Sequence, residues 1–144
     1  MTDQGVGALP AKPRIVLVVD DDDMIRRLVR TVLEADDYDV VEARNGDIAL
    51  ELASQAHPVV VLLDIMMPGI DGVEVCRRLD HASVKVVILT ARDDPALEVA
   101  CRAAGADAFL TKPFSSVDLI DVVAGFTSGA PGGSNGANGS TGSS

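Results

Sequence analysis

The sequence has few of the residues that small proteins use for covalent or metal cross-links. It contains two cysteines and no tryptophan, and Cys76 and Cys101 do not have the spacing of a metal-ligand pair. We therefore expect both thiols to be reduced and packed in the interior. A chain of 144 residues suits one domain and can bury an apolar core without cross-links.

Long apolar runs are also missing. No run approaches the ~20 residues needed to span a bilayer. The polar segment 1–12 lacks the basic start and apolar stretch of a secretory signal, so we expect a cytoplasmic protein without membrane insertion. The net charge is −10, and neither Lys nor Arg follows Lys112. This charge argues against direct binding to nucleic acid, because phosphates require a basic face.

The chain divides into three zones. Residues 1–12 form an irregular leader, residues 13–126 carry regular hydrophobic patterning, and residues 127–144 are rich in Gly, Ser and Asn. The last zone has almost nothing to bury, so we expect a flexible tail whose ordering entropy no core could offset. Such a tail suits either a natural end or a linker to a further domain.

The central zone alternates strand-like and helix-like segments. Three β-branched runs are apolar on both faces and predict buried parallel strands, while two mixed runs predict edge strands. In chain order the five runs are 14–19, 39–43, 59–63, 85–89 and 107–110. Helical periodicity is clearest from Ile25 to Leu33, with Arg26, Arg27, Arg30 and Glu34 on the polar face, and weaker near 46–55, 71–80, 95–104 and 115–126.

Right-handed crossovers between these β/α units predict an α/β fold. We expect a flavodoxin-like, doubly wound parallel sheet of five strands in the order 2-1-3-4-5, with helices on both faces. Asp22 or Asp23 is expected to cap the first helix and Ser115 or Ser116 the last, with Gly46 and Gly105 near helix ends. In such folds, ligands bind outside the carboxyl ends of the strands, where the strand order reverses.

Charged and hydroxyl side chains stand where the predicted strands end. Asp20 and Asp21 follow the first strand, Asp64 the third, Thr90 the fourth and Lys112 the fifth. Carboxylates gathered in one pocket repel, and a divalent cation relieves the repulsion; an all-oxygen set of ligands suits Mg²⁺ or Mn²⁺. A metal beside an ammonium group favours phosphoryl chemistry. Asp64 is the best candidate nucleophile, because it stands alone after an apolar strand.

Each of these elements alone has an ordinary structural explanation. Runs of Asp cap helices, a Thr often follows a strand, and Lys-Pro is common in turns. Their joint occurrence at strand ends is far more specific. The sequence has no Ser-His-Asp set and no GxxxxGK loop, and His57 and His81 belong to no motif, so we expect them to be surface or packing residues.

Four segments resemble the signatures of response-regulator receiver domains, the CheY-like family. They are VLVVDDDDMIRRLVR, LLDIMMPGIDG, VVILTAR and FLTKPF, and the likeness covers about residues 14–126. It implies two-component signal transduction: a histidine kinase or phosphotransfer protein donates a phosphoryl group, and the switched surface engages a downstream protein target. It also implies a protein that catalyses its own phosphorylation and dephosphorylation without being a conventional enzyme.

The resemblance implies a role for each site residue. Asp64 is the phosphate acceptor, Asp20 and Asp21 hold Mg²⁺ with Asp64 and the backbone carbonyl of Met66, and Lys112 contacts the phosphoryl group. Thr90 and Phe109 form the switch, while the side chains of Met66 and Arg92 tune the phosphate lifetime. The family also has a cis peptide bond at the position of Lys112–Pro113.

Three alternatives stay open. The chain could be a receiver fragment of a larger regulator, or a degenerate receiver that is not phosphorylated. It could also be a haloacid-dehalogenase-type phosphatase, because Asp20-Asp21-Asp22 contains an Asp-x-Asp, although Met24 stands where Thr or Val is expected. Phosphorylation of Asp20 rather than Asp64 would distinguish that phosphatase.

The last predicted helix bears on the oligomeric state. It carries Asp118 and Asp121 but no basic residue. This is not the charge pattern of receivers that dimerise through this face. We therefore expect a monomer or a weak dimer.

Overall fold

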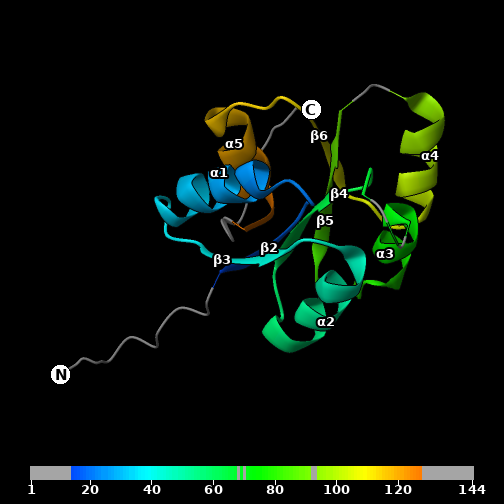
Figure 1. Cartoon of the computed structure of the whole chain (residues 1–144), viewed down its shortest axis with the longest axis horizontal. Helices are drawn as coiled ribbons and strands as arrows, with labels where there is room; N and C mark the ends of the chain where they lie inside the picture. Colours follow the sequence, from blue (N-terminus) through cyan, green and yellow to red (C-terminus); the bar gives the residue numbers. More distant parts are fainter. Residues whose placement is uncertain (1–13, 68, 70, 92–93, 128–144) are drawn as a thin grey trace.

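The computed structural model describes residues 14–67, 69, 71–91 and 94–127. Over these residues, strands and helices alternate along the chain (Figure 1). The elements are β2 (Ile15–Val19), α1 (Asp23–Glu34), β3 (Asp39–Ala43), α2 (Gly46–Ala56), β4 (Val60–Asp64), α3 (Gly72–Arg78), β5 (Lys85–Thr90), α4 (Pro95–Ala103), β6 (Ala108–Thr111) and α5 (Ser116–Thr127). The predicted leader 1–12, most of the predicted tail and Arg92 lie outside the described residues.

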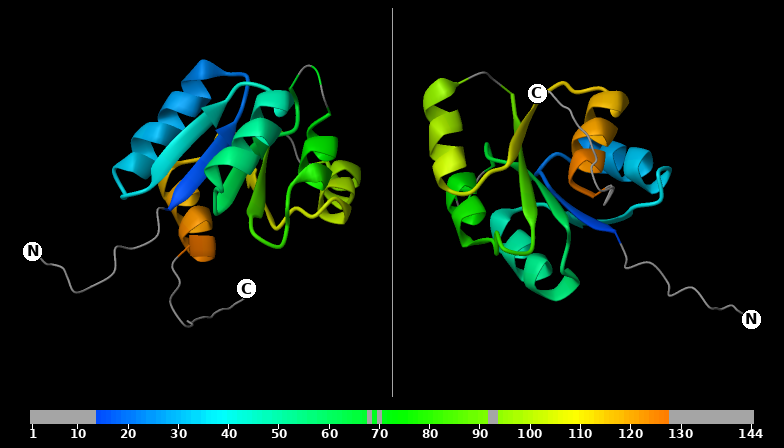
Figure 2. Two further views of the ribbon diagram at one scale, coloured as in Figure 1. Left: turned by 90° about the horizontal axis from the view of Figure 1, so that it is seen from below. Right: turned by 180° about the vertical axis from the view of Figure 1, so that it is seen from behind.

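The strands form one parallel sheet in the order β3-β2-β4-β5-β6, which confirms the predicted order 2-1-3-4-5. Helices α1 and α5 lie together on one face, and α2, α3 and α4 cover the other (Figures 1 and 2). The two mixed runs are the edge strands, as predicted, because an edge strand has fewer neighbours to bury its side chains.

Each face of the sheet has its own apolar core. Strand β2 serves both, because successive side chains point to opposite faces. Leu17 and Val19 belong to the cluster under α2, α3 and α4, while Val16 and Val18 belong to the cluster under α1 and α5. All four are at most 1% exposed. Burial on both faces explains why this strand reads as a continuous apolar run.

Polar caps start the helices. The side chain of Asp22 accepts a hydrogen bond of 2.9 Å from the Met24 amide and caps α1. The Ser115 hydroxyl accepts one of 3.0 Å from the Asp118 amide at the start of α5. Gly46 is the first residue of α2, and the cap is Asn45, whose side chain accepts from the Ile48 amide. Each cap satisfies an amide that has no partner inside its helix.

Both cysteines are buried and free, as predicted. Burial raises the pKa of the Cys76 thiol to about 11, so this thiol stays protonated and unreactive at neutral pH.

His57 is exposed at the end of α2, and His81 lies with its Nε2 atom 2.6 Å from the Cys76 carbonyl oxygen. A Cβ atom at Gly105, whose φ is +112°, would meet the His81 ring at 2.5 Å.

Some predicted boundaries were wrong by one or two residues. Helix α3 ends at Arg78 rather than near residue 80, and β6 begins at Ala108 because Asp107 turns its carboxylate to the Val86 amide at 2.8 Å. Helix α5 reaches Thr127, one residue into the predicted tail, where the Thr127 hydroxyl lies 2.6 Å from the Tyr38 hydroxyl. Among the described residues, no helix combines the length and apolarity needed to cross a membrane.

Candidate functional site

The ends of four strands meet at one edge of the sheet. Asp20 follows β2, Asp64 ends β4, Thr90 ends β5, and Lys112 follows β6. Parallel strands place all their carboxyl ends on the same edge, so residues far apart in the sequence gather there. Carboxylate oxygens of Asp20, Asp21 and Asp64 lie within 4.8 Å of one another. We call these three residues and Lys112 the acidic pocket.

Lys112 joins the two buried carboxylates of the acidic pocket. Its ammonium nitrogen Nζ lies 2.7 Å from Oδ2 of Asp20 and 3.3 Å from Oδ2 of Asp64. The Asp20 side chain is 0% exposed and that of Asp64 6%, so water solvates either carboxylate poorly. Buried charges persist only when they are paired and hydrogen-bonded, as these are.

Burial and pairing act in opposite directions on the charges of the acidic pocket. Burial raises the pKa of Asp20 even though Lys112 donates a hydrogen bond to it. Burial also works against the charged form of Lys112, but the hydrogen bond to Asp20 and the charge of Asp64 outweigh it and raise the Lys112 pKa. The acidic pocket contains one ammonium and three carboxylates, so it keeps an excess of negative charge. That excess and the all-oxygen donors fit a hard divalent cation.

Backbone amides fix the direction of both buried carboxylates. The Asp22 amide donates to Oδ1 of Asp20, and the Met66 amide donates to Oδ1 of Asp64, each at 2.9 Å. In both cases the donor lies two residues beyond the aspartate, so each loop orients the carboxylate that precedes it. Oδ2 of each carboxylate then faces Lys112. The Met66 side chain projects outward and is largely exposed.

The predicted switch residues lie beside the acidic pocket, toward β6. Thr90 is buried at the end of β5, and Phe109 lies on β6, half-buried. Both line a cavity of about 40 Å³ together with Ile65 and Leu97; we call these four residues the switch cavity. The guanidinium carbon of Arg102 lies 4.8 Å from the centre of the Phe109 ring. This cation–π contact holds the ring in its half-buried position.

The structure therefore brings Asp20, Asp21, Asp64 and Lys112 together, as the strand-end argument predicted. The Lys112 amide donates to the Thr90 carbonyl at 2.7 Å, which ties the acidic pocket to the switch cavity. The Lys112–Pro113 peptide is cis, as the resemblance implied. Arg92, predicted to tune the phosphate lifetime, lies outside the described residues.

Sequence reasoning missed one residue at this edge. Arg26 was assigned only to the polar face of the first helix, yet its Nη1 atom donates to the backbone carbonyl of Asp20 at 2.6 Å. Its partner Glu42 is 16 residues away on β3. Helical periodicity carries no signal for a contact between elements, so only the fold could reveal it.

Comparisons with known proteins place the chain among related sequences and structures. The sequence profile of the response regulator receiver domain matches residues 16–124. The transcriptional regulatory protein ResD of Bacillus subtilis is 42% identical over 106 residues, which are 73% of this chain and 44% of ResD. The transcriptional regulatory protein SrrA of Staphylococcus aureus is 38% identical over the same shares. The chain thus spans less than half the length of these curated relatives.

Solved structures show the same fold. Chemotaxis protein CheY4 of Vibrio cholerae superposes with a TM-score of 0.75 at 29% identity, covering 80% of this chain and 99% of CheY4. A response regulator of Chloroflexus aurantiacus reaches 0.73 at 33% identity, covering 80% and 98%. The BeF₃-activated DrrB receiver domain reaches 0.72 at 31% identity, covering 80% and 97%.

Proposed function

The chain belongs to the response regulator receiver domain family, and on that premise we propose that Asp64 accepts a phosphoryl group from the phosphohistidine of a histidine kinase or phosphotransfer protein. The observation that carries this proposal is the acidic pocket, in which one lysine bridges two buried carboxylates beside a third. Of these carboxylates, Asp64 belongs to the central strand β4 and is presented by a loop whose amide orients it.

In the proposed transfer, an oxygen of the Asp64 carboxylate forms a bond to phosphorus while the phosphorus–nitrogen bond of phosphohistidine breaks. The imidazole leaves and takes up a proton. The Met66 amide and Lys112 hold the carboxylate from two sides, so its orientation is set before the donor arrives. The Lys112 ammonium then offsets charge on the phosphoryl oxygens.

The metal site in this proposal consists of Asp20, Asp21, Asp64 and the backbone carbonyl of Met66. Mg²⁺ fits these donors, and Mn²⁺ offers the same coordination. When bound, the ion supplies positive charge that offsets the carboxylates and the phosphoryl oxygens. Asp20 would serve both Lys112 and the ion, so metal binding and the Lys112 contact would be coupled through one carboxylate.

The proposed response is a shift between two states of the switch cavity. Thr90 moves toward the phosphoryl group, and the Phe109 ring fills the space beside it. Phosphorylation shifts this equilibrium only by its different interaction energy with the two states. Phe109 has no hydroxyl, so the ring contributes to output by packing. We further propose that the side chains of Met66 and Arg92 tune the lifetime of the phosphorylated form.

The partner proteins follow from the same proposal. A kinase or phosphotransfer protein supplies the phosphoryl group, and an unidentified protein target recognises the switched face. The relatives ResD and SrrA are transcriptional regulatory proteins of which this chain spans 44%. The receiver itself, with a net charge of −10, is proposed to contact protein rather than nucleic acid and to act in the cytoplasm as a monomer or weak dimer.

The test uses acetyl phosphate as the donor. The protein is incubated with acetyl phosphate and Mg²⁺, and the modified residue is located by intact and peptide mass spectrometry. We expect one phosphoryl group on Asp64, none in Asp64→Asn, and none with EDTA. Asp80→Asn, which changes an exposed aspartate in the loop before β5, is the matched control and should be modified like the wild type.

Other outcomes contradict the proposal in different ways. Modification of Asp20 would indicate the phosphatase-type chemistry considered above. A protein that stays unmodified with both acetyl phosphate and a phosphorylated histidine phosphotransfer protein is a degenerate receiver. Modification that persists in Asp64→Asn would remove Asp64 from the reaction.

A further inference from the structure

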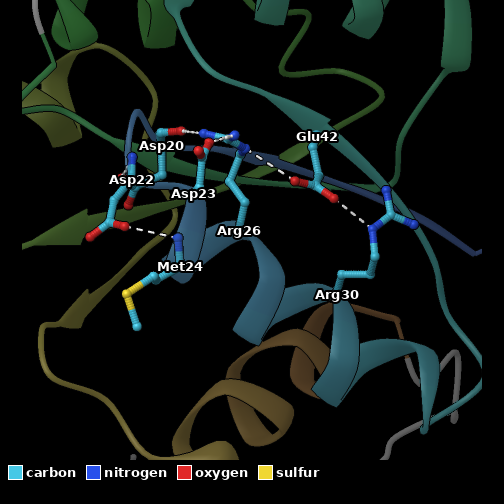
Figure 3. A network of polar contacts seen from close by, with 7 residues as sticks. All are labelled: Asp20, Asp22, Asp23, Met24, Arg26, Arg30 and Glu42. Atoms are coloured by element: carbon cyan, nitrogen blue, oxygen red, sulfur yellow. Dashed lines mark hydrogen bonds and ion pairs between the residues drawn. The ribbon is translucent and has the colours of Figure 1, made fainter.

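The peptide that joins Asp20 to Asp21 is held from outside the acidic pocket. The Asp20 amide donates to the Ala43 carbonyl at 3.1 Å, which continues the pairing of β2 with β3 by one residue. The Asp20 carbonyl instead accepts a 2.6 Å hydrogen bond from Nη1 of Arg26 on α1 (Figure 3). The guanidinium therefore supplies the hydrogen bond that the amide of a neighbouring strand would donate if the sheet continued.

Fixing this carbonyl fixes more than one residue. The peptide unit is planar, so the Asp20 carbonyl and the Asp21 amide rotate together. Its orientation is defined by ψ of Asp20 and φ of Asp21, the torsions on which the direction of the Asp21 side chain depends. This orientation also sets the position of the Asp22 amide, which donates to Oδ1 of Asp20. One hydrogen bond from Arg26 thus constrains both aspartates of the acidic pair.

The Arg26 guanidinium is itself anchored on three sides. Its Nε atom donates to Glu42 on β3 at 3.1 Å, and its Nη2 atom contacts the carboxylate of Asp23. The Arg26 side chain is only 12% exposed. The planar fork of arginine can satisfy these partners at once, whereas a lysine ammonium has no matching geometry. These three partners and the low exposure hold the Arg26 guanidinium in one position, unlike a solvated arginine on the surface.

Glu42 accepts hydrogen bonds from two arginines, Arg26 and Arg30. The second of these, Arg30, donates from Nε to Oε2 of Glu42 at 2.6 Å (Figure 3). Its Nη1 atom donates to Glu34 at 2.7 Å. The hydrogen bond from Arg30 lowers the pKa of Glu42, ahead of the hydrogen bond from Arg26, so Glu42 stays charged at neutral pH. Arg30 shares Glu42 with Arg26 but is not among the donors to Asp20, which makes it the natural control.

We propose that Arg26 is a positioning residue for the acidic pair: by holding the Asp20 carbonyl, it orients Asp20 and Asp21 for metal binding. This inference rests on the proposed function for its consequence in phosphoryl transfer. Its direct consequence, the affinity for the metal alone, does not require a phosphodonor. A salt bridge that merely joined α1 to β3 would affect stability but not metal affinity.

The test compares Arg26→Met with Arg30→Met in the full chain. Mg²⁺ affinity is measured by isothermal titration calorimetry, the free energy of unfolding by urea, and exchange of the Asp21 and Asp22 amides by NMR without metal. Loss of a partner that orients a metal ligand typically costs about 10–100-fold in affinity. We expect a loss of that size in Arg26→Met, with faster exchange of both amides. Arg30→Met should keep a Mg²⁺ affinity within about twofold of the wild type, because Arg30 donates to Glu42 and Glu34 and not to the Asp20 carbonyl.

Two results would overturn the proposal. One is an unchanged Mg²⁺ affinity in a folded Arg26→Met; the other is an equal loss in Arg26→Met and Arg30→Met. If Arg26→Met does not fold, Arg26→Lys serves in its place. It keeps the charge but not the fork, so we expect weaker Mg²⁺ binding and faster exchange of the Asp22 amide, and wild-type values for both would overturn the proposal.

The proposed function fails separately from this inference. A wild type that binds Mg²⁺ but takes no phosphoryl group on Asp64 contradicts the proposed function. In that protein the comparison of Arg26→Met with Arg30→Met still decides whether Arg26 positions the acidic pair.

Discussion

The acidic pocket and the switch cavity lie side by side at one edge of the sheet, yet they are built in opposite ways. In the acidic pocket, Asp20 and Asp64 are hydrogen-bonded through both carboxylate oxygens, and Lys112 bridges them. In the switch cavity, the half-buried Phe109 ring borders a space of about 40 Å³ and makes a cation–π contact with the exposed Arg102.

This difference matches the two tasks of the proposed function. Accepting a phosphoryl group requires reacting atoms held in place, because small displacements reduce the rate steeply. Responding to it requires a group that can move, and a side chain in a close-packed interior moves only where there is room. The Lys112 amide, bonded to the Thr90 carbonyl, joins the acidic pocket to the switch cavity.

The largest expected effect comes from Lys112→Met, which removes the ammonium that bridges Asp20 and Asp64 in the acidic pocket. Removing one partner from buried charges typically costs about 3–5 kcal/mol. We expect the metal-free variant to lose about 3 kcal/mol of unfolding free energy at pH 7 and to recover much of it at a lower pH, where a carboxyl of the acidic pocket binds a proton. The phosphorylation rate should fall about 100-fold or more. Urea unfolding at both pH values and mass spectrometry measure these effects.

Lys85→Met is the matched control for that substitution. The Lys85 side chain is half exposed, and its Nζ atom lies 4.0 Å from Asp107. Exposed ion pairs contribute about 0–1 kcal/mol, so this variant should resemble the wild type. If Lys112→Met were as stable as the wild type at pH 7, the acidic pocket would not be holding two ionised carboxylates.

Gly72→Ala tests the backbone that separates the two regions. A Cβ atom at Gly72 would lie 2.5 Å from the Cα atom of Ile65, which follows Asp64 and lines the switch cavity. Overpacking of this kind typically costs about 1–3 kcal/mol, and we expect the phosphorylation rate to fall as well. Gly125→Ala, with nothing within 4 Å, should instead gain up to about 1 kcal/mol. Thermal unfolding of both variants, together with their phosphorylation rates, checks this, and equal behaviour would contradict it.

Asp20→Asn tests the cost of burying the Asp20 charge through the pH dependence of stability. Burial raises the pKa of Asp20 above its ordinary value of 3.8. The folded protein then binds more protons at this group than the unfolded protein does, so stability falls as pH rises from about 3.8 through the raised value. Without metal, Asp20→Asn should be more stable than the wild type at pH 7 and have a flatter pH profile, because the neutral amide carries no buried charge.

The same substitution should weaken Mg²⁺ binding, because it removes a charged ligand. Unfolding by urea between pH 4 and pH 8, with and without Mg²⁺, measures both effects. A variant that is less stable than the wild type at pH 7 without metal would show that the bond to Lys112 outweighs the burial of Asp20.

The smallest expected effect is that of Arg102→Ala on the switch cavity. An exposed cation–π contact contributes about 0.5–1 kcal/mol, so stability should change little. The population with the Phe109 ring turned inward should rise about 2–5-fold, the equivalent of that energy. Fluorine NMR of a fluorinated Phe109 measures the population. Arg77→Ala, on the exposed face of α3, is the control and should leave it unchanged.

Much of the fold and of the candidate site could be predicted from local pattern. The apolar run of β2 predicted a strand buried on both faces, and the mixed run 39–43 predicted an edge strand with the observed bounds. The order of the β/α units then predicted that Asp20, Asp64 and Lys112 would meet. Boundaries were less predictable where a side chain replaces a ladder bond, as Asp107 does for Val86.

By itself, the sequence determined the fold class, the sheet order and the residues that gather at its carboxyl edge. These follow from periodicity and from the handedness of crossovers, which are local or general properties of the chain. Only the tertiary structure decided that Lys112 bridges two carboxylates, that the Phe109 ring borders a cavity, and that Arg26 holds the Asp20 carbonyl. Those contacts depend on distances between elements far apart in the chain, and no local pattern encodes such distances.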